Sequence, residues 1–228
     1  MTGNAQALLN ETEVRVVGSL VEKQVTTPDY YPLTLNALVA ACKQISNRDP
    51  VVAYDERTVA DAIDTLRSKN LVYVFYGADS RVPKYKHMLR EALDLTAAQL
   101  AVMCVLMLRG PQTVGEIRGR TGRLHEFADL AEVETTLDEL SRRDDGPLVV
   151  KLPRQPGRKD SRYAQTLAGV PEVTEEAAAA ESASEPRRRA GTDAGGERVA
   201  RLEAEVESLR REVDEMRRQF EEFKRQFE

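Results

Sequence analysis

The sequence has 228 residues, enough for two small domains, and its 33 basic and 38 acidic residues give a formal net charge of −5. Charged residues make up 31% of the chain and aromatic residues 5%. This composition excludes a histone-like polycation and a disulfide-rich scaffold, and the longest apolar run, residues 100–108, is far shorter than the ~20 residues of a membrane span. Because residues 1–6 contain neither a basic stretch nor an apolar core, we expect no signal peptide, no membrane contact and a cytoplasmic location.

The residue types that usually supply catalysis or metal binding are sparse. The chain holds two cysteines and two histidines: Cys42, Cys104, His87 and His125. They lack the close spacing of zinc ligands, and both cysteines stand among apolar residues, so we expect buried thiols. Gly115, Gly119 and Gly122 lack the Gly-Lys-Ser/Thr ending of a phosphate loop, and their helical spacing predicts close helix packing. The sequence therefore predicts a non-enzymatic protein with no catalytic residue, cofactor or metal.

The first predicted unit, residues 8–90, opens with a helix. Asn10 and Glu13 form a capping-box pattern in front of apolar residues at helical spacing. A second helix follows Thr34, and the acidic cap Asp55 opens a third. A β-rich segment, a turn and a returning strand complete the unit, at residues 71–76, 77–83 and 84–88.

The second predicted unit, residues 94–168, repeats this order, and its first helix has the same apolar spacing 86 residues later. Its helix starts are marked by two capping pairs and an acidic cap: Thr96 with Gln99, Thr113 with Glu116, and Asp129. Its two β segments lie at 148–152 and 162–167. Three helices followed by a hairpin is the winged-helix order. We therefore predict a mainly α fold with small β-hairpins (α+β), organised as tandem winged-helix domains.

Several composite motifs fill the first unit. They are a Glu-x-Arg-Val opening, Gly-Ser-Leu, Glu-Lys, Thr-Pro-x-Tyr-Tyr-Pro-Leu-Thr and Ser-Asn-Arg-Asp-Pro, at residues 13–16, 18–20, 22–23, 27–34 and 46–50. The second unit adds Pro-Gly-Arg-Lys-Asp-Ser-Arg-Tyr at residues 156–163. In these motifs the chain resembles, over about residues 8–168, the YceH-like family of bacterial proteins of unknown function. The resemblance implies paired winged helices and no established activity.

Two polar segments of the first unit, residues 26–32 and 46–50, are candidate partner-binding surfaces. They contain Tyr30, Tyr31 and Arg48, residue types that are enriched at binding hot spots. The alternative is that the prolines of these segments rigidify the connections while the tyrosines pack beneath them.

The predicted hairpins contain the candidate nucleic-acid contacts. These are Arg81, Lys84, Lys86, Arg154, Arg158, Lys159 and Arg162. Basic hairpins can neutralise DNA phosphates, although charged hairpin tips are also ordinary solvated surface. The third helices argue against groove binding, because residues 55–69 hold four acidic against three basic side chains, and residues 129–143 hold five against two.

Residues 171–197 are rich in Ala, Glu, Ser, Gly and Pro and include the run Arg187, Arg188 and Arg189. A segment with so few large apolar residues cannot form a core, so we predict a flexible linker. The triple Arg is either a nucleic-acid contact or ordinary linker charge.

Residues 198–228 show an unbroken three–four spacing of apolar residues, which predicts a coiled coil. The predicted dimerisation positions are Val199, Leu202, Val206, Leu209, Val213, Met216, Phe220 and Phe223. Val at position a with Leu at position d, and opposite charges at the paired e and g positions, favour a parallel homodimer. The alternatives are a trimer or docking site made by the Phe rings, or a single amphipathic helix that folds onto the domains.

Taken together, these patterns predict a homodimeric regulatory or scaffolding adaptor that docks protein partners through paired winged helices. The alternative is a DNA-binding transcriptional regulator that contacts phosphates through its basic hairpins. Salt dependence distinguishes the two, because phosphate contacts weaken steeply as salt rises.

Overall fold

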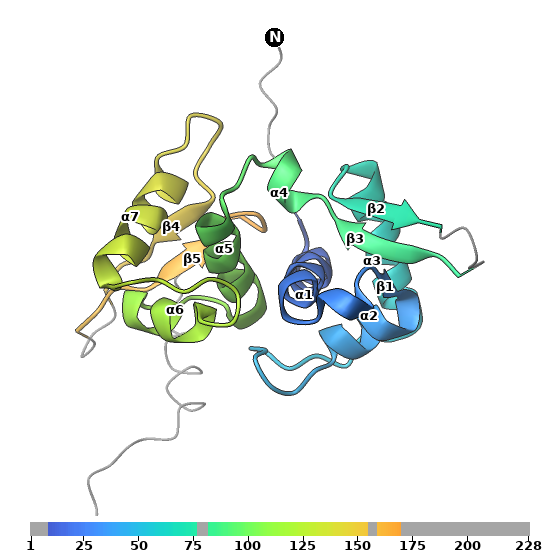
Figure 1. Cartoon of the computed structure of the whole chain (residues 1–228). Coiled ribbons are helices and arrows are strands. Elements are labelled where there is room, and N and C mark those ends of the chain that lie inside the picture. Colours follow the sequence, from blue (N-terminus) through green and yellow to red (C-terminus); the bar gives the residue numbers. More distant parts are fainter. Residues whose placement is uncertain (1–8, 77–81, 155–158, 170–228) are drawn as a thin grey trace, which may run out of the picture. The chain divides into compact units, whose positions relative to one another are not determined.

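The computed structural model describes residues 9–76, 82–154 and 159–169, and Figure 1 shows the order of their elements. The first half, residues 9–93, begins with α1 (Glu11–Thr26), a 3-10 turn η1 (Pro28–Tyr30), β1 (Leu33–Thr34) and α2 (Leu35–Cys42). It continues with α3 (Glu56–Ser68), β2 (Val72–Phe75) and β3 (Lys84–His87). The three strands form an antiparallel sheet in the order β1-β3-β2, with Leu33 opposite Tyr85 and Val72 opposite His87.

The second half, residues 95–169, repeats the order after the short connecting helix α4 (Leu89–Ala92). Its elements are α5 (Ala97–Arg109), α6 (Val114–Thr121), α7 (Leu130–Ser141), β4 (Val149–Lys151) and β5 (Tyr163–Gln165). The two strands pair antiparallel, and Gln112 makes an isolated bridge to Tyr163 at the place that β1 occupies in the first half. The described chain is therefore mainly helical, with a few small antiparallel strands.

The predicted helix starts are confirmed. Complete capping boxes open α1, α5 and α6, and aspartate side chains accept from backbone N–H groups at the starts of α3 and α7. These caps satisfy N–H groups that a helix leaves without an intrahelical partner. The same local chemistry therefore fixes where the main helices of both halves begin.

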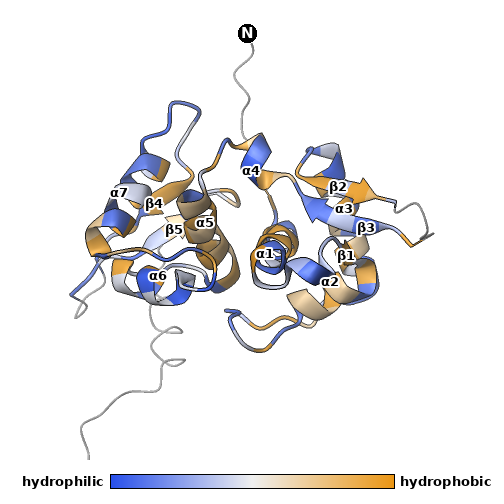
Figure 2. Cartoon of the chain, in the orientation of Figure 1, coloured by the Kyte–Doolittle hydropathy of each residue, from blue (hydrophilic) through white to orange (hydrophobic). Residues whose placement is uncertain are grey.

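The core is organised around α1 and α5, which pack against each other. In α1 every residue from Glu13 to Glu22 is buried, and in α5 every residue from Gln99 to Leu108 is buried. Figure 2 shows α5 as predominantly hydrophobic, whereas α1 combines apolar and polar residues. The apolar side chains of the two helices belong to one continuous cluster that also includes residues of α2, α3, α6 and α7.

The two central helices cross at Gly18. The thiol of Cys104 donates to the Gly18 carbonyl at 3.6 Å, and a Cβ added to Gly18 would come within 2.9 Å of Leu108. Gly18 and Cys104 are 86 residues apart, the same offset that separates the two copies in the sequence. Equivalent positions that touch each other indicate a local two-fold relation between the helices. Glycine is therefore needed at this crossing for close approach.

Other expectations are corrected or confirmed by the structure. Close packing at Gly115, Gly119 and Gly122 is wrong, because an added Cβ at each would meet nothing within 4 Å. Cys42 and Cys104 are free and buried, as expected, and burial raises the pKa of both thiols. No helix among the described residues is long and apolar enough to cross a membrane.

Candidate functional site

Arg48 lies in the loop between α2 and α3, with its guanidinium turned into the protein and only 6% of the residue exposed. It donates to both carboxylate oxygens of Glu22 on α1, at 2.7 and 3.0 Å, and to the Ala41 carbonyl at 2.9 Å. Burial alone would raise the pKa of Glu22, but the hydrogen bonds and charge of Arg48 outweigh it and hold that pKa below its ordinary value. The Arg48 side chain is therefore not exposed for contact with a partner.

The rest of the 46–50 motif joins the two helices α1 and α5. The Arg15 guanidinium of α1 donates to the Pro50 carbonyl at 2.6 Å, and the Asp49 N–H donates to the Leu108 carbonyl of α5 at 2.9 Å. The Asn47 side-chain oxygen accepts from Arg109. For this motif the structure favours the rigid-connection alternative, because its polar groups hold α1 and α5 together.

The neighbouring tyrosines of the 26–32 segment have different environments. Tyr30, in η1, is 79% exposed, whereas Tyr31 is partly buried and its hydroxyl accepts from the His87 N–H at 2.8 Å. Burial raises the pKa of Tyr31. Of this predicted pair, only Tyr30 presents its ring to solvent, and Tyr31 ties the segment to β3.

His87 is an internal polar link rather than an exposed group. Its Nδ1 accepts from the Leu89 N–H at 3.3 Å, so Nε2 carries the hydrogen and donates to the Gln24 side chain at 2.7 Å. Burial lowers the pKa of His87 to about 4, which keeps the ring neutral near pH 7. His87 therefore connects α1 to the end of β3.

An exposed aromatic group, called here the aromatic group on β2, lies on this strand of the first-half hairpin and at the residue that follows it. Tyr73, Phe75 and Tyr76 are all exposed, with Tyr76 at 67%. A groove of about 510 Å³ between the end of α3 and β2 is lined by both tyrosines together with Asp64 and other residues. The sequence prediction missed these side chains, although the alternation of Tyr73 and Phe75 with Val72 and Val74 was a usable period-2 signal.

The basic hairpin candidates of the first half are partly covered. Lys84 and Lys86 are half-buried on β3, and the Lys86 ammonium lies 5.3 Å from the centre of the Tyr73 ring. This distance fits a cation–π contact. Arg81 lies outside the described residues.

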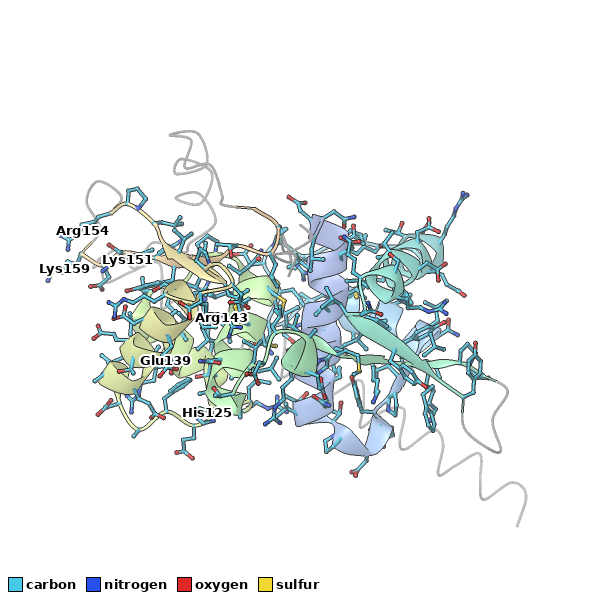
Figure 3. All side chains as sticks on the ribbon, turned by 90° about the horizontal axis from the view of Figure 1, so that it is seen from above. His125, Glu139, Arg143, Lys151, Arg154 and Lys159 are labelled. Atoms are coloured by element: carbon cyan, nitrogen blue, oxygen red, sulfur yellow. The ribbon has the colours of Figure 1, made fainter. Side chains whose placement is uncertain are left out.

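The second-half hairpin presents its basic residues more openly. Figure 3 shows Lys151, Arg154 and Lys159 at the outer edge of the β4–β5 hairpin, away from the two central helices. All three are exposed, Arg162 is half-buried, and Arg158 lies outside the described residues. The predicted basic surface is therefore brought together here in part.

The exposed faces of the third helices are acidic, as the residue counts predicted. On α3, Arg67 pairs with Asp64 at 3.2 Å and Arg57 lies 4.0 Å from Asp61. On α7, Glu134, Asp138 and Glu139 are exposed. Arginines that are already paired within their own helix are poorly placed to neutralise phosphates.

A pocket of about 400 Å³ lies between the two halves, and no sequence pattern pointed to it. Its walls come from the C-terminal end of α1, the loop after α2, α5, and α6 with the loop that follows it. Because these four segments are far apart in the sequence, only the packed structure brings them together.

The predicted dimerisation site stays untested. The dimerisation positions Val199, Leu202, Val206, Leu209, Val213, Met216, Phe220 and Phe223 lie outside the described residues. Within the parts of the chain that the structure describes, no group of three or more His, Cys, Asp or Glu side chains could hold a metal ion.

Comparison with known proteins places the chain in a family. A family described as "Protein of unknown function, DUF480" matches residues 9–158. A UPF0502 protein of Citrifermentans bemidjiense is 55% identical over 201 residues, which cover 88% of this chain and 89% of that protein. UPF0502 proteins of Opitutus terrae and Geobacter sulfurreducens are 51% and 52% identical, over 89% and 90% of this chain and 84% and 91% of theirs. The chain therefore belongs to the DUF480/UPF0502 family of bacterial proteins.

Proposed function

We propose that this chain is a non-enzymatic adaptor that docks a protein partner on its first half. It would consist of two winged-helix domains, residues 8–90 and 94–168, a linker at 171–197 and a parallel homodimeric coiled coil at 198–228. The element order α1-β1-α2-α3-β2-β3 and the sheet order β1-β3-β2 support the winged-helix assignment. The heptad spacing of the tail is the basis for the coiled coil.

The exposed aromatic group on β2 is the observation that supports docking best. Aromatic side chains are costly to leave in water and recur at the energetic centres of protein interfaces. Tyr73 and Tyr76 line a groove next to α3, where a partner's apolar side chain could be seated. The acidic α3 beside this groove disfavours DNA in the same place.

The first test removes the aromatic rings without touching the core. The double variant Tyr73→Ser/Tyr76→Ser is compared with Tyr30→Ser, which removes an exposed ring elsewhere in the first half. Each full-length protein is crosslinked in lysate of the native host after nuclease treatment, and captured proteins are identified by mass spectrometry. We expect the double variant to lose one protein that the wild type and the control retain at high salt. Equal capture by all three proteins would contradict docking at this groove.

The second candidate function is phosphate binding by the second-half hairpin, which the exposure of Lys151, Arg154 and Lys159 favours. It predicts duplex-DNA binding that falls by orders of magnitude as salt rises and that Arg154→Ala/Lys159→Ala weakens for every sequence. Fluorescence anisotropy with a labelled duplex measures this directly. Absence of salt-sensitive binding would leave the protein-docking proposal as the better account.

A further inference from the structure

The pocket between the halves has the size of a small-ligand site. Its volume of about 400 Å³ lies at the lower end of the range typical of sites for small organic molecules. The lining includes Glu22 and Lys23 of α1, Asn47 of the loop after α2, Arg109 of α5 and Arg120 of α6. A ligand bound there would touch both halves at once.

The lining is strongly cationic. Four basic side chains line the pocket: Lys23, Arg109, Arg120 and Arg123. The one carboxylate in the lining of this pocket, as the described residues form it, is Glu22, which is already bound by Arg48 at 2.7 Å and by Lys23 at 3.1 Å. Glu116 lies outside the lining, 3.6 Å from Arg120. The positive charge of the pocket lining is thus only partly neutralised by the nearby carboxylates of Glu22 and Glu116.

Two of these cations lack a carboxylate partner. The guanidinium of Arg109 donates to the uncharged amide of Asn47, and for Arg123 no ion pair or hydrogen bond is found within residues 9–76, 82–154 and 159–169. Partial burial lowers the pKa of Arg109, and repulsion by the nearby Arg120 lowers it further. An anion placed between these guanidinium groups would relieve the repulsion.

The remaining lining suits a ligand with an organic body. Val105, Leu108 and Leu124 supply apolar surface. Thr27 and Gln44 add polar surface, although the Thr27 hydroxyl already donates to the Lys23 carbonyl and the Gln44 amide already contacts Lys23 and Ser46. Guanidinium groups bind phosphate oxygens through paired, charge-assisted hydrogen bonds, which match phosphate geometry better than a lysine ammonium does. Several arginines and several apolar residues in one lining therefore favour a phosphate head attached to an apolar or ring-shaped body.

We propose that this pocket binds a small organic phosphate and that the bound ligand strengthens the contact between the two halves. The phosphate is held by Arg109, Arg120 and Arg123, and the body of the ligand lies against Val105, Leu108 and Leu124. A ligand that binds only the folded, packed state stabilises that state in proportion to its concentration over its Kd. The site does not depend on the adaptor function and can be tested separately from it.

The test uses phenyl phosphate as the probe, with full-length protein in isothermal titration calorimetry and thermal unfolding. We expect saturable binding and a rise in unfolding temperature. Inorganic phosphate should bind more weakly because it lacks the body, and benzoate should bind more weakly because a carboxylate makes fewer guanidinium contacts. If neither phenyl phosphate nor inorganic phosphate binds saturably, the site proposal is wrong. If benzoate binds as tightly as phenyl phosphate, the phosphate assignment is wrong.

Two pairs of variants locate the bound probe. Gly119 lines the pocket, and a Cβ added there would have no atom within 4 Å, so Gly119→Leu should fill the pocket without a clash. Gly115→Leu, in the same helix but outside the pocket lining, is the control. Arg123→Gln removes one pocket cation, and the control Arg90→Gln removes an exposed cation from α4. We expect Gly119→Leu to abolish binding and Arg123→Gln to weaken it about tenfold or more, with both controls near the wild type. Equal behaviour of a variant and its control would overturn the placement.

Discussion

The two halves of residues 9–169 follow one order of elements, yet their surfaces differ. Among the described residues, the exposed large apolar side chains of the first half include Tyr30, Ile45 and the aromatic group on β2, whereas the second half shows only Leu130. The second half instead exposes the acidic face of α7 and the basic hairpin residues. Helix caps and apolar spacing specify the shared order, so the residues of the outer surface are free to differ between the halves.

The halves also differ in how they use charge inside the protein. In the first half, Glu13 is bound by Lys69 at 2.8 Å and Glu22 by Arg48 at 2.7 Å, and both carboxylates are on the buried central helix α1. The equivalent helix α5 is almost entirely apolar where it is buried. The first half therefore depends on buried ion pairs, while the second half depends on apolar packing. This contrast can be tested by comparing matched substitutions in the two halves.

The largest expected effect is loss of the buried arginine. Arg48→Ala leaves the Glu22 carboxylate buried with Lys23 as its remaining partner, and should lower the free energy of unfolding by about 3 kcal/mol. The matched change in the second half is Arg143→Ala, whose partner Asp145 is half exposed, and should cost less than about 1 kcal/mol. Urea unfolding monitored by circular dichroism measures both. Equal losses would show that the ion pairs of the two halves do not differ in importance.

The next effect concerns the crossing of α1 and α5. Gly18→Ala places a methyl group 2.9 Å from Leu108 and 3.1 Å from Met107, so it should destabilise the protein by about 1–3 kcal/mol. Gly115→Ala, at an open helical position, should be neutral or stabilising by up to about 1 kcal/mol. Thermal unfolding of both variants gives the comparison. A stable Gly18→Ala variant would mean that the helices can separate slightly without loss.

Acid should weaken the first half in particular. Because its partners hold the folded pKa of Glu22 below the unfolded value, the stability it contributes is present above about pH 4.5 and is lost as the pH falls through the folded pKa. Glu22→Gln should be less stable near pH 7 but should lose less stability on acidification. Urea unfolding over a pH series tests this, and an unchanged slope in Glu22→Gln would contradict it.

The smallest expected effects come from removing the equivalent caps of α1 and α5. Asn10 and Thr96 open α1 and α5 with complete capping boxes, so Asn10→Ala and Thr96→Ala should each cost about 1 kcal/mol. The two losses should be similar, since the caps perform the same task at equivalent positions. Chemical unfolding of the two variants under one set of conditions measures the difference. If removal of the cap in one half leaves the free energy of unfolding unchanged, tertiary contacts alone fix the start of that helix.

The helix starts and the duplication could be read from the sequence because they depend on residues three or four positions apart, such as Asn10 and Glu13. The partner of Arg48 could not, since Glu22 is 26 residues away and meets it only after α1 and α2 pack. Tyr30 and Tyr31 have the same side chain and adjacent positions, yet η1 turns one outward and the other toward β3. The pocket between the halves required four separate segments and gave no local signal.

The contact at Gly18 and Cys104 has a consequence for how the halves stay together. Two separate polypeptides that meet through equivalent helix positions would dissociate on dilution, as any dimer does. Here the segment around α4 joins the halves in one chain, so their encounter is governed by an effective concentration set by that short connection rather than by the amount of protein in solution. The surface residues of each half can then change while the two halves remain packed against each other.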